Sequence, residues 1–126
     1  MDKPWQEAFR EHDFSAEASV RGRHMDVALS GTADLMVKGH LDRFLRTLHA
    51  EAQRRALTEV SVDVRRLEFM NPSCLKSFVW WISTVQEQPA EDRYLIVFLS
   101  SPTVYWQRRS LNALACLAGD IISVQL

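Results

Sequence analysis

The sequence predicts an α/β fold built on a mixed sheet of about five strands, with helices packed mainly on one face. The first observation is an early pair of segments in which polar and apolar residues alternate on either side of a turn, as in a hairpin. The second is that short β-branched or apolar runs then alternate with longer segments whose apolar residues recur at steps of three and four. The predicted order is therefore β-β-α-β-α-β-α-β, and the later strands pair largely in parallel through right-handed crossovers.

The composition is that of one ordinary globular domain. The 126 residues are 47% hydrophobic and 25% charged, so the chain can bury the core of one domain and leaves no room for a separate catalytic domain beside it. The formal net charge is −1, so the charge of the whole molecule indicates neither nucleic acid nor an anionic membrane as a partner. No apolar run approaches the roughly 20 residues that span a bilayer, so we expect no integral membrane segment.

Cysteine use and the first residues favour the cytoplasm. Cys74 and Cys116 lie far apart in the sequence and form no CxxC motif. Residues 1–14 carry charges throughout, unlike a secretory signal peptide. We therefore expect a cytoplasmic protein.

The domain is predicted to cover residues 14–126, preceded by an appendage over residues 1–13. The appendage mixes Trp5 and Phe9 with charged residues, which is compatible with a short amphipathic helix or a loose tail. An edge strand starts at Phe14 and ends before a turn at residues 21–23. The second strand of the hairpin then runs to Gly31.

A helix over residues 37–56 follows, with one apolar face and one charged face. Its apolar residues are Val37, Leu41, Phe44, Leu45, Leu48, Ala52 and Ala56. The alternating Val60, Val62 and Val64 then predict a central strand over residues 60–67.

The second half of the chain repeats the strand-helix pattern twice. Asn71 and Pro72 are typical of a helix start and predict a helix over residues 72–87. The apolar run at 94–99 predicts a buried strand, and Ser101 and Pro102 again precede a helical segment, which extends to Gly119. The last strand covers residues 121–126. The predicted core includes Leu29, Leu41, Leu45, Leu48, Val62, Val64, Leu75, Val79, Ile82, Ile96, Phe98, Leu114 and Ile122.

Two motifs and the order of elements resemble the STAS family, named for sulphate transporters and anti-sigma factor antagonists. Residues 29–34, Leu-Ser-Gly-Thr-Ala-Asp, are similar to the family's G-x-x-D motif, which ends here at Asp34. Residues 62–75 resemble its longest motif, a strand followed by D-S-S/T-G-L at a helix start. The resemblance implies that Ser73 stands where a partner kinase phosphorylates the family's members. Three positions depart from the motif, with Asn71 for Asp, Pro72 for Ser and Cys74 for Gly.

A phosphate on Ser73 would be tolerated by the fold. The first turn of a helix carries the positive end of the helix dipole, which stabilises an exposed negative charge by about 0.3–1 kcal/mol. The alternative is that Ser73 is only a polar residue of the first turn.

The resemblance implies a small bacterial signalling module, akin to an anti-sigma factor antagonist, that binds a regulator protein or serine kinase and is switched by phosphorylation at Ser73. The expected contact residues are Asp34, Asn71, Ser73, Lys76, Ser77 and Trp80. We expect Trp80 to be at least half exposed and to anchor the partner, because buried Trp often carries much of an interface's energy. Packing of Trp80 against Trp5 or Phe9 is the alternative.

A second functional class stays open. The chain could serve as a constitutive, unphosphorylated scaffold subunit of a larger signalling or lipid-transport complex, and the three departures favour this class somewhat. A homodimer is compatible with the sequence.

Catalysis has the least support. The four histidines are scattered without metal-site spacing, and Cys74 is expected to be a small apolar filler facing the sheet rather than a reactive thiol. No glycine-rich phosphate loop or other cofactor motif is visible. We therefore expect no enzyme activity, no cofactor and no metal.

Overall fold

The structure is a computed structural model that describes residues 4–126, and it contains one sheet of six strands together with three α-helices. The strands are β1 (Gln6–Glu11), β2 (Phe14–Arg21), β3 (His24–Ala33), β4 (Glu59–Met70), β5 (Leu95–Leu99) and β6 (Ile122–Gln125). The α-helices are α1 (Lys38–Arg54), α2 (Pro72–Gln86) and α3 (Tyr105–Leu117), with short 3-10 helices η1 (Leu35–Val37) and η2 (Ala90–Asp92). Across residues 4–126, no helix has the length and apolar character needed to cross a membrane.

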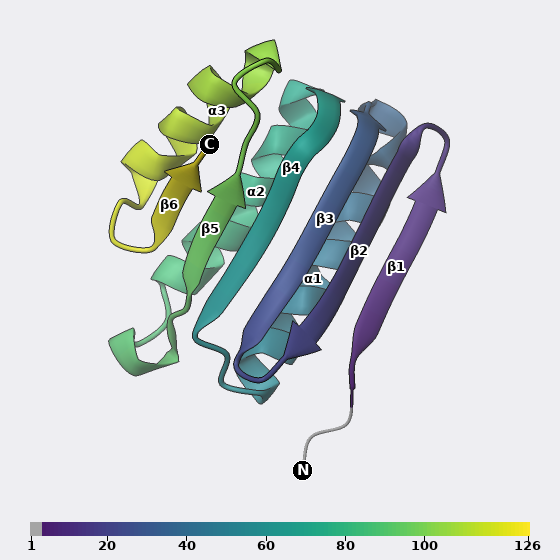
Figure 1. Cartoon of the computed structure of the whole chain (residues 1–126). Helices are drawn as coiled ribbons and strands as arrows, with labels where there is room; N and C mark the ends of the chain where they lie inside the picture. The colour runs from purple at the N-terminus through teal and green to yellow at the C-terminus, as the bar shows by residue number, and fades with distance from the viewer. Residues whose placement is uncertain (1–3) are drawn as a thin grey trace.

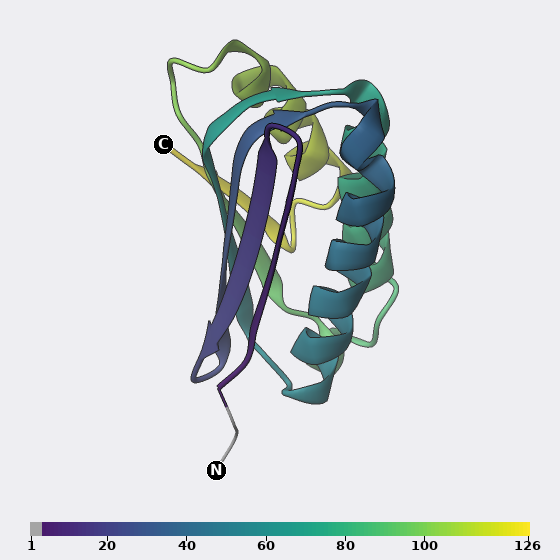
Figure 2. The same ribbon diagram turned by 90° about the vertical axis from the view of Figure 1, so that its right-hand side faces the viewer.

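The strands lie in the sheet in the order in which they occur in the chain (Figure 1). β1, β2 and β3 pair antiparallel, whereas β3, β4, β5 and β6 pair in parallel. The helices cover one face of the sheet, and the other face is open (Figures 1 and 2). The predicted mixed sheet, with helices on one face, is confirmed.

Alternation along the central strands separates the buried face from the open face. In β4, Val60, Val62 and Val64 point into the core, whereas Ser61 and Asp63 between them are partly exposed. Successive side chains of a strand point to opposite faces, so this pattern indicates that only one face of the sheet is packed.

The predicted core is confirmed except on α2, where Leu75 and Val79 are only partly buried. The buried residues of this helix are instead Cys74, Ser77, Phe78, Trp81, Ile82 and Val85. Trp81 can be buried because its indole Nε1 donates to the Tyr94 hydroxyl over 2.7 Å. The burial of Trp81 turns the helix, so that Leu75 and Val79 lie at the margin of the core.

The expectation of a separate N-terminal appendage is wrong for the described part of that segment. Residues Gln6–Glu11 form β1, an edge strand paired with β2 from Gln6 opposite Ser19 to Glu11 opposite Phe14. The ring of Phe9 lies 5.5 Å from those of both Phe14 and Phe44. β1 therefore raises the strand count from about five to six and moves the edge of the sheet from β2 to β1. Residues 1–3 of the predicted appendage lie outside the described part.

β4 continues beyond its pairing with β5, and side chains of α3 donate hydrogen bonds to backbone carbonyls in the part of β4 that β5 does not pair with. The β4–β5 ladder ends at Asp63, so the carbonyls of Val64 and Leu67 have no strand partner on that side. Gln107 of α3, a buried residue, donates through Nε2 to both carbonyls over 2.5 and 3.0 Å. Trp106 Nε1 also donates to the Leu67 carbonyl over 2.9 Å. These bonds fix α3 against the twisted end of β4.

Candidate functional site

The start of α2 has the cap that the sequence predicts. Asn71 is extended, with φ −62° and ψ 140°, and its side-chain oxygen accepts from the Ser73 amide over 2.8 Å. The Asn71 carbonyl accepts from the amides of Cys74 and Leu75 over 2.8 and 3.1 Å. Pro72 lacks an N–H, so the first amides of the helix are all satisfied locally. Ser73 lies in this first turn, where we expect it to be exposed, and it is partly exposed.

The turn after β3 lies directly against this helix start. The Asn71 amide donates to the Ala33 carbonyl over 2.7 Å, and Cys74 Sγ donates to the Asp34 carbonyl over 3.2 Å. The Asp34 carboxylate accepts from the Met36 amide over 2.9 Å and so caps η1. The two family-like motifs therefore meet at one end of the sheet, where Asp34 shapes its own turn.

Ser77 is buried, which corrects the expectation that it faces a partner. Its hydroxyl donates to the Asp42 carboxylate of α1, and Lys38 Nζ lies 3.2 Å from the same hydroxyl and 3.0 Å from Asp42 Oδ2. Burial alone would raise the pKa of Asp42, but the bonds from Ser77 and Lys38 outweigh it and lower that pKa. Ser77 therefore belongs to a polar tie between α1 and α2.

Cys74 faces the core, as predicted, and its side chain is fully buried. Burial raises the pKa of the thiol. The nearby carboxylates of Asp34 and Asp42 also raise this pKa, whereas Lys38 lowers it. The thiol is therefore kept in its neutral form despite its place near a helix start.

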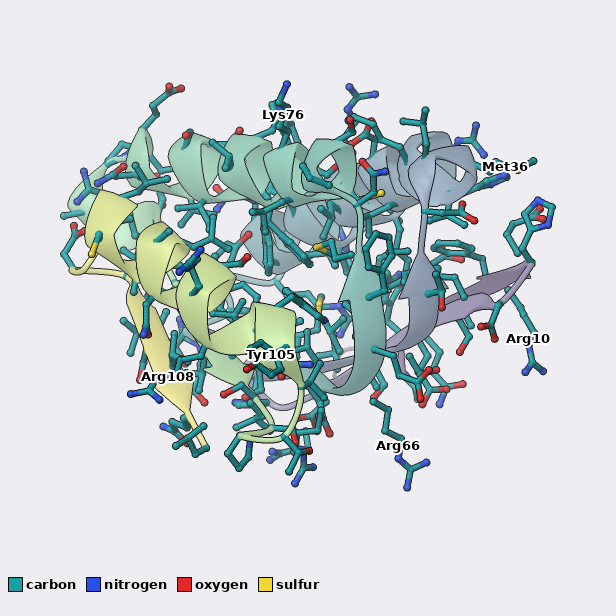
Figure 3. All side chains as sticks on the ribbon, turned by 90° about the horizontal axis from the view of Figure 1, so that it is seen from above. Arg10, Met36, Arg66, Lys76, Tyr105 and Arg108 are labelled. Carbon is teal, nitrogen blue, oxygen red and sulfur yellow. The ribbon has the colours of Figure 1, made fainter. Side chains whose placement is uncertain are left out.

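Lys76 and Trp80 lie on the outer side of α2, as predicted (Figure 3 labels Lys76). Trp80 is 40% exposed, short of the half that we expected, because Arg46 of α1 lies over its ring at 5.6 Å from the centroid. The alternative, in which Trp80 packs with Trp5 or Phe9, is not what forms: within residues 4–126 Trp80 makes no ring contact with either residue. Phe9 instead stacks on His40 and meets Phe14 at a tilt and Phe44 edge-on.

Exposed apolar side chains stand around this end of the sheet, and sequence reasoning missed them. Leu35 and Met36 of η1 and Phe69 near the end of β4 are all exposed. Figure 3 looks onto this end of the molecule and shows the Met36 side chain projecting outward at its margin. The available signal was that Leu35 and Met36 are large apolar residues that belong to no periodic segment. We call Leu35, Met36 and Phe69 the apolar rim.

Comparison with known proteins supports one fold. No family model and no curated protein matches the sequence. A solved structure described as an anti-sigma factor antagonist from Mycobacterium paratuberculosis superposes with a TM-score of 0.64. The match covers 89% of this chain and 85% of the other at 13% sequence identity. The chain has a STAS-like fold.

The three residues that depart from the STAS motif each have a structural role in this STAS-like domain. Asn71 caps α2, Pro72 takes the first helical position and Cys74 fills the core beside the Asp34 turn. Each substitute performs a structural role that its position requires. The helix start is therefore formed with these residues: Asn71 and Pro72 alter the surface chemistry beside Ser73, whereas Cys74 lies in the core.

The open face of the STAS-like sheet carries a serine-histidine-carboxylate group that the sequence did not suggest. His24 Nε2 lies 3.0 Å from Ser61 Oγ, and His24 Nδ1 lies 3.1 Å from Glu59 Oε2. Nε2 also lies 3.1 Å from Asp26 Oδ1, so a carboxylate competes for the atom that would accept the serine proton. These residues lie on β3 and β4, and each of these strands is hydrogen-bonded to a neighbouring strand on both sides. The backbone amides of the two ladders are therefore not available to bind an oxyanion. We interpret the group as a polar hydrogen-bonding cluster of the sheet surface.

Proposed function

We propose that this chain is a cytoplasmic signalling module that resembles an anti-sigma factor antagonist, binding a regulator protein or serine kinase through the start of α2. The observation that carries the proposal is the partly exposed Ser73 hydroxyl beside the apolar rim of Leu35, Met36 and Phe69. Exposed apolar groups clustered at one end of a small domain favour a protein partner. The STAS-like fold supports this class of function.

In this proposal Ser73 is the phosphoacceptor that controls binding. A phosphate adds close to two negative charges, which a partner seated on the apolar rim would have to desolvate. The amides of the first turn are already used by Asn71, so the phosphate would gain only the helix dipole and the neighbouring Lys76. Modification would therefore disfavour the complex while leaving the fold nearly unchanged.

A constitutive scaffold is the second candidate, favoured by the departures at Asn71, Pro72 and Cys74. In that case the same surface binds a partner and Ser73 is never modified. Both candidates are non-catalytic, and neither requires a cofactor.

The deciding experiment compares Ser73→Asp and Ser73→Ala in binding to the partner obtained from the native host. For the switch, we expect Ser73→Asp to weaken binding at least tenfold, Ser73→Ala to bind normally, and thermal melting to change little in either variant. Ser123→Asp is the matched control, because it adds the same charge at an exposed position on β6. Mass spectrometry of the protein from cells should find phosphate on Ser73. Tight binding by Ser73→Asp together with an unmodified Ser73 would establish the scaffold instead.

Trp80→Ala tests how far the contact surface extends along α2. If the partner covers Trp80, affinity should fall by about 2 kcal/mol with little change in the melting temperature. Unchanged affinity would confine the surface to the helix start and the apolar rim, whereas a large loss of stability would make Trp80 a structural partner of Arg46.

A further inference from the structure

The outer face of α3 forms a continuous exposed stripe. Helical spacing places its members one above another at steps of three and four, which keeps them on one side of the helix. The exposed residues of the stripe are Tyr105, Arg108, Arg109, Asn112, Ala113, Cys116 and Leu117. Tyr105 is 100% exposed, which is unusual for a large aromatic side chain. Such a residue makes no contribution to the core of this domain.

The charge of the stripe is of one sign. Arg108 and Arg109 are consecutive and exposed, and within residues 4–126 neither makes an ion pair. The sequence between Arg93 and Asp120 contains no Asp or Glu, so α3 has no carboxylate of its own to neutralise them. The nearly neutral whole chain therefore conceals a local positive surface.

The stripe is held on a rigid support. Gln107 and Trp106 bond α3 to the carbonyls of β4, and Gln107 Oε1 accepts from the Ser101 amide over 2.8 Å. Leu111 and Leu114 on the same inner side are buried. A surface that is already ordered loses little conformational freedom when a partner binds.

We propose that the outer face of α3 is a docking surface for an acidic amphipathic helix of a partner protein. Arg108 and Arg109 would pair with carboxylates, and Tyr105 and Leu117 would contact apolar residues at either end of the stripe. Asn112 and Ala113 between them are small enough to let a second helix approach closely. The thirteen residues of α3 span about 20 Å, a length that matches three to four turns of such a helix.

This surface lies on a different helix from the one proposed around Ser73, on α3 rather than α2. Figure 3 shows Tyr105 and Arg108 on α3, while Lys76 points away from the sheet on α2. The two surfaces can therefore be tested independently. A failure at α3 leaves the proposed function at α2 in place.

The native Cys116 provides the probe, because it is exposed within the stripe whereas Cys74 is buried. The full chain is labelled there with a benzophenone maleimide, irradiated in an extract of the native host, and the cross-linked segment is sequenced by mass spectrometry. We expect a segment with Asp and Glu flanking an apolar helical stripe. A synthetic peptide of that segment should bind the unlabelled chain, shifting backbone amide NMR signals of α3.

Charge-reversal variants decide whether the contact is the proposed one. The double variant Arg108→Glu with Arg109→Glu should weaken peptide binding at least tenfold. Tyr105→Ala should weaken peptide binding several-fold. Arg10→Glu with Arg66→Glu is the matched control, since both are exposed and the net charge changes equally. Ser73→Asp should also leave the peptide affinity unchanged. The proposal is overturned by cross-links only to a second copy, nucleic acid or lipid, by the absence of a cross-link, or by a peptide that tolerates the reversal.

Discussion

Gln107 is the side chain whose role depends most on its surroundings. It occupies the inner stripe of α3 in phase with Leu111 and Leu114, a polar residue where the spacing calls for an apolar one. Its amide bonds to the Val64 and Leu67 carbonyls of β4 and to the amide of Ser101. Trp106 also donates to the Leu67 carbonyl, so it is the Val64 carbonyl and the Ser101 amide that depend on Gln107 for these bonds. Only the end of the β4–β5 ladder explains why a glutamine is needed there.

We predict that Gln107→Leu lowers the free energy of unfolding by about 2–3 kcal/mol, because buried backbone groups lose their partners even though volume is conserved. Urea denaturation followed by circular dichroism measures the loss. Asn112→Leu is the control, since it makes a similar change on the exposed side of the same helix. A Gln107→Leu protein as stable as the native chain would mean that the bonds to β4 contribute nothing.

At the scale of elements, two glycines both have a positive φ but differ in how much space surrounds them. Gly22 in the β2–β3 turn has φ +60° with open space around the position of a Cβ atom. Gly31 at the bulged end of β3 has φ +90°, and a Cβ there would lie 2.0 Å from the Asp13 carbonyl oxygen. The β1–β2 turn closes against Gly31, where the Thr32 amide donates to that same carbonyl over 2.6 Å.

We predict that Gly31→Ala destabilises the protein by more than about 3 kcal/mol. The backbone of Asp13 would have to move away from the new Cβ atom, and residue 31 would also keep a φ angle that is strained for alanine. Gly22→Ala should cost only about 1 kcal/mol, from the angle alone. Thermal and urea unfolding of the two variants give the comparison. Equal losses would show that the contact with Asp13 is easily relieved.

For the whole molecule, the first strand is part of the sheet and covers one side of the core. Phe9 contacts Phe14 of β2 and Phe44 of α1, so it joins the edge strand to the helical layer. Removal of β1 would expose these rings and would leave β2 as an unprotected edge, which promotes association between sheets.

We predict that deletion of residues 1–13 lowers the melting temperature strongly and causes concentration-dependent aggregation, measured by calorimetry and light scattering. Phe9→Ala, which keeps the strand, should cost about 2 kcal/mol, less than the loss for a fully buried Phe. The exposed Glu7→Ala should be nearly neutral. A truncated chain that melts like the native one would return residues 1–13 to the status of an appendage.

The sequence by itself determined the order of elements from β2 onward, the parallel pairing of β3 to β6 and the start of α2. Each rests on a local signal, such as alternating valines in β4 or the cap at Asn71 and Pro72, and here the tertiary contacts agree with these signals. Ser73 could be assigned to the first turn of α2 for the same reason. The motif resemblance then indicated the STAS-like fold.

Only the tertiary structure decided which face of each element is buried and which distant residues contact one another. The segment 78–82 is apolar on nearly all sides, so its pattern cannot set the phase of α2, and the phase follows instead from the bond between Trp81 and Tyr94. Ser77 is buried because Lys38 and Asp42, remote in sequence, supply its partners. β1 forms because β2 offers an edge and Phe14 and Phe44 offer apolar contact, none of which the mixed composition of residues 1–13 reveals. In each case the deciding interaction joins residues far apart in the chain, which a reading of local periodicity cannot include.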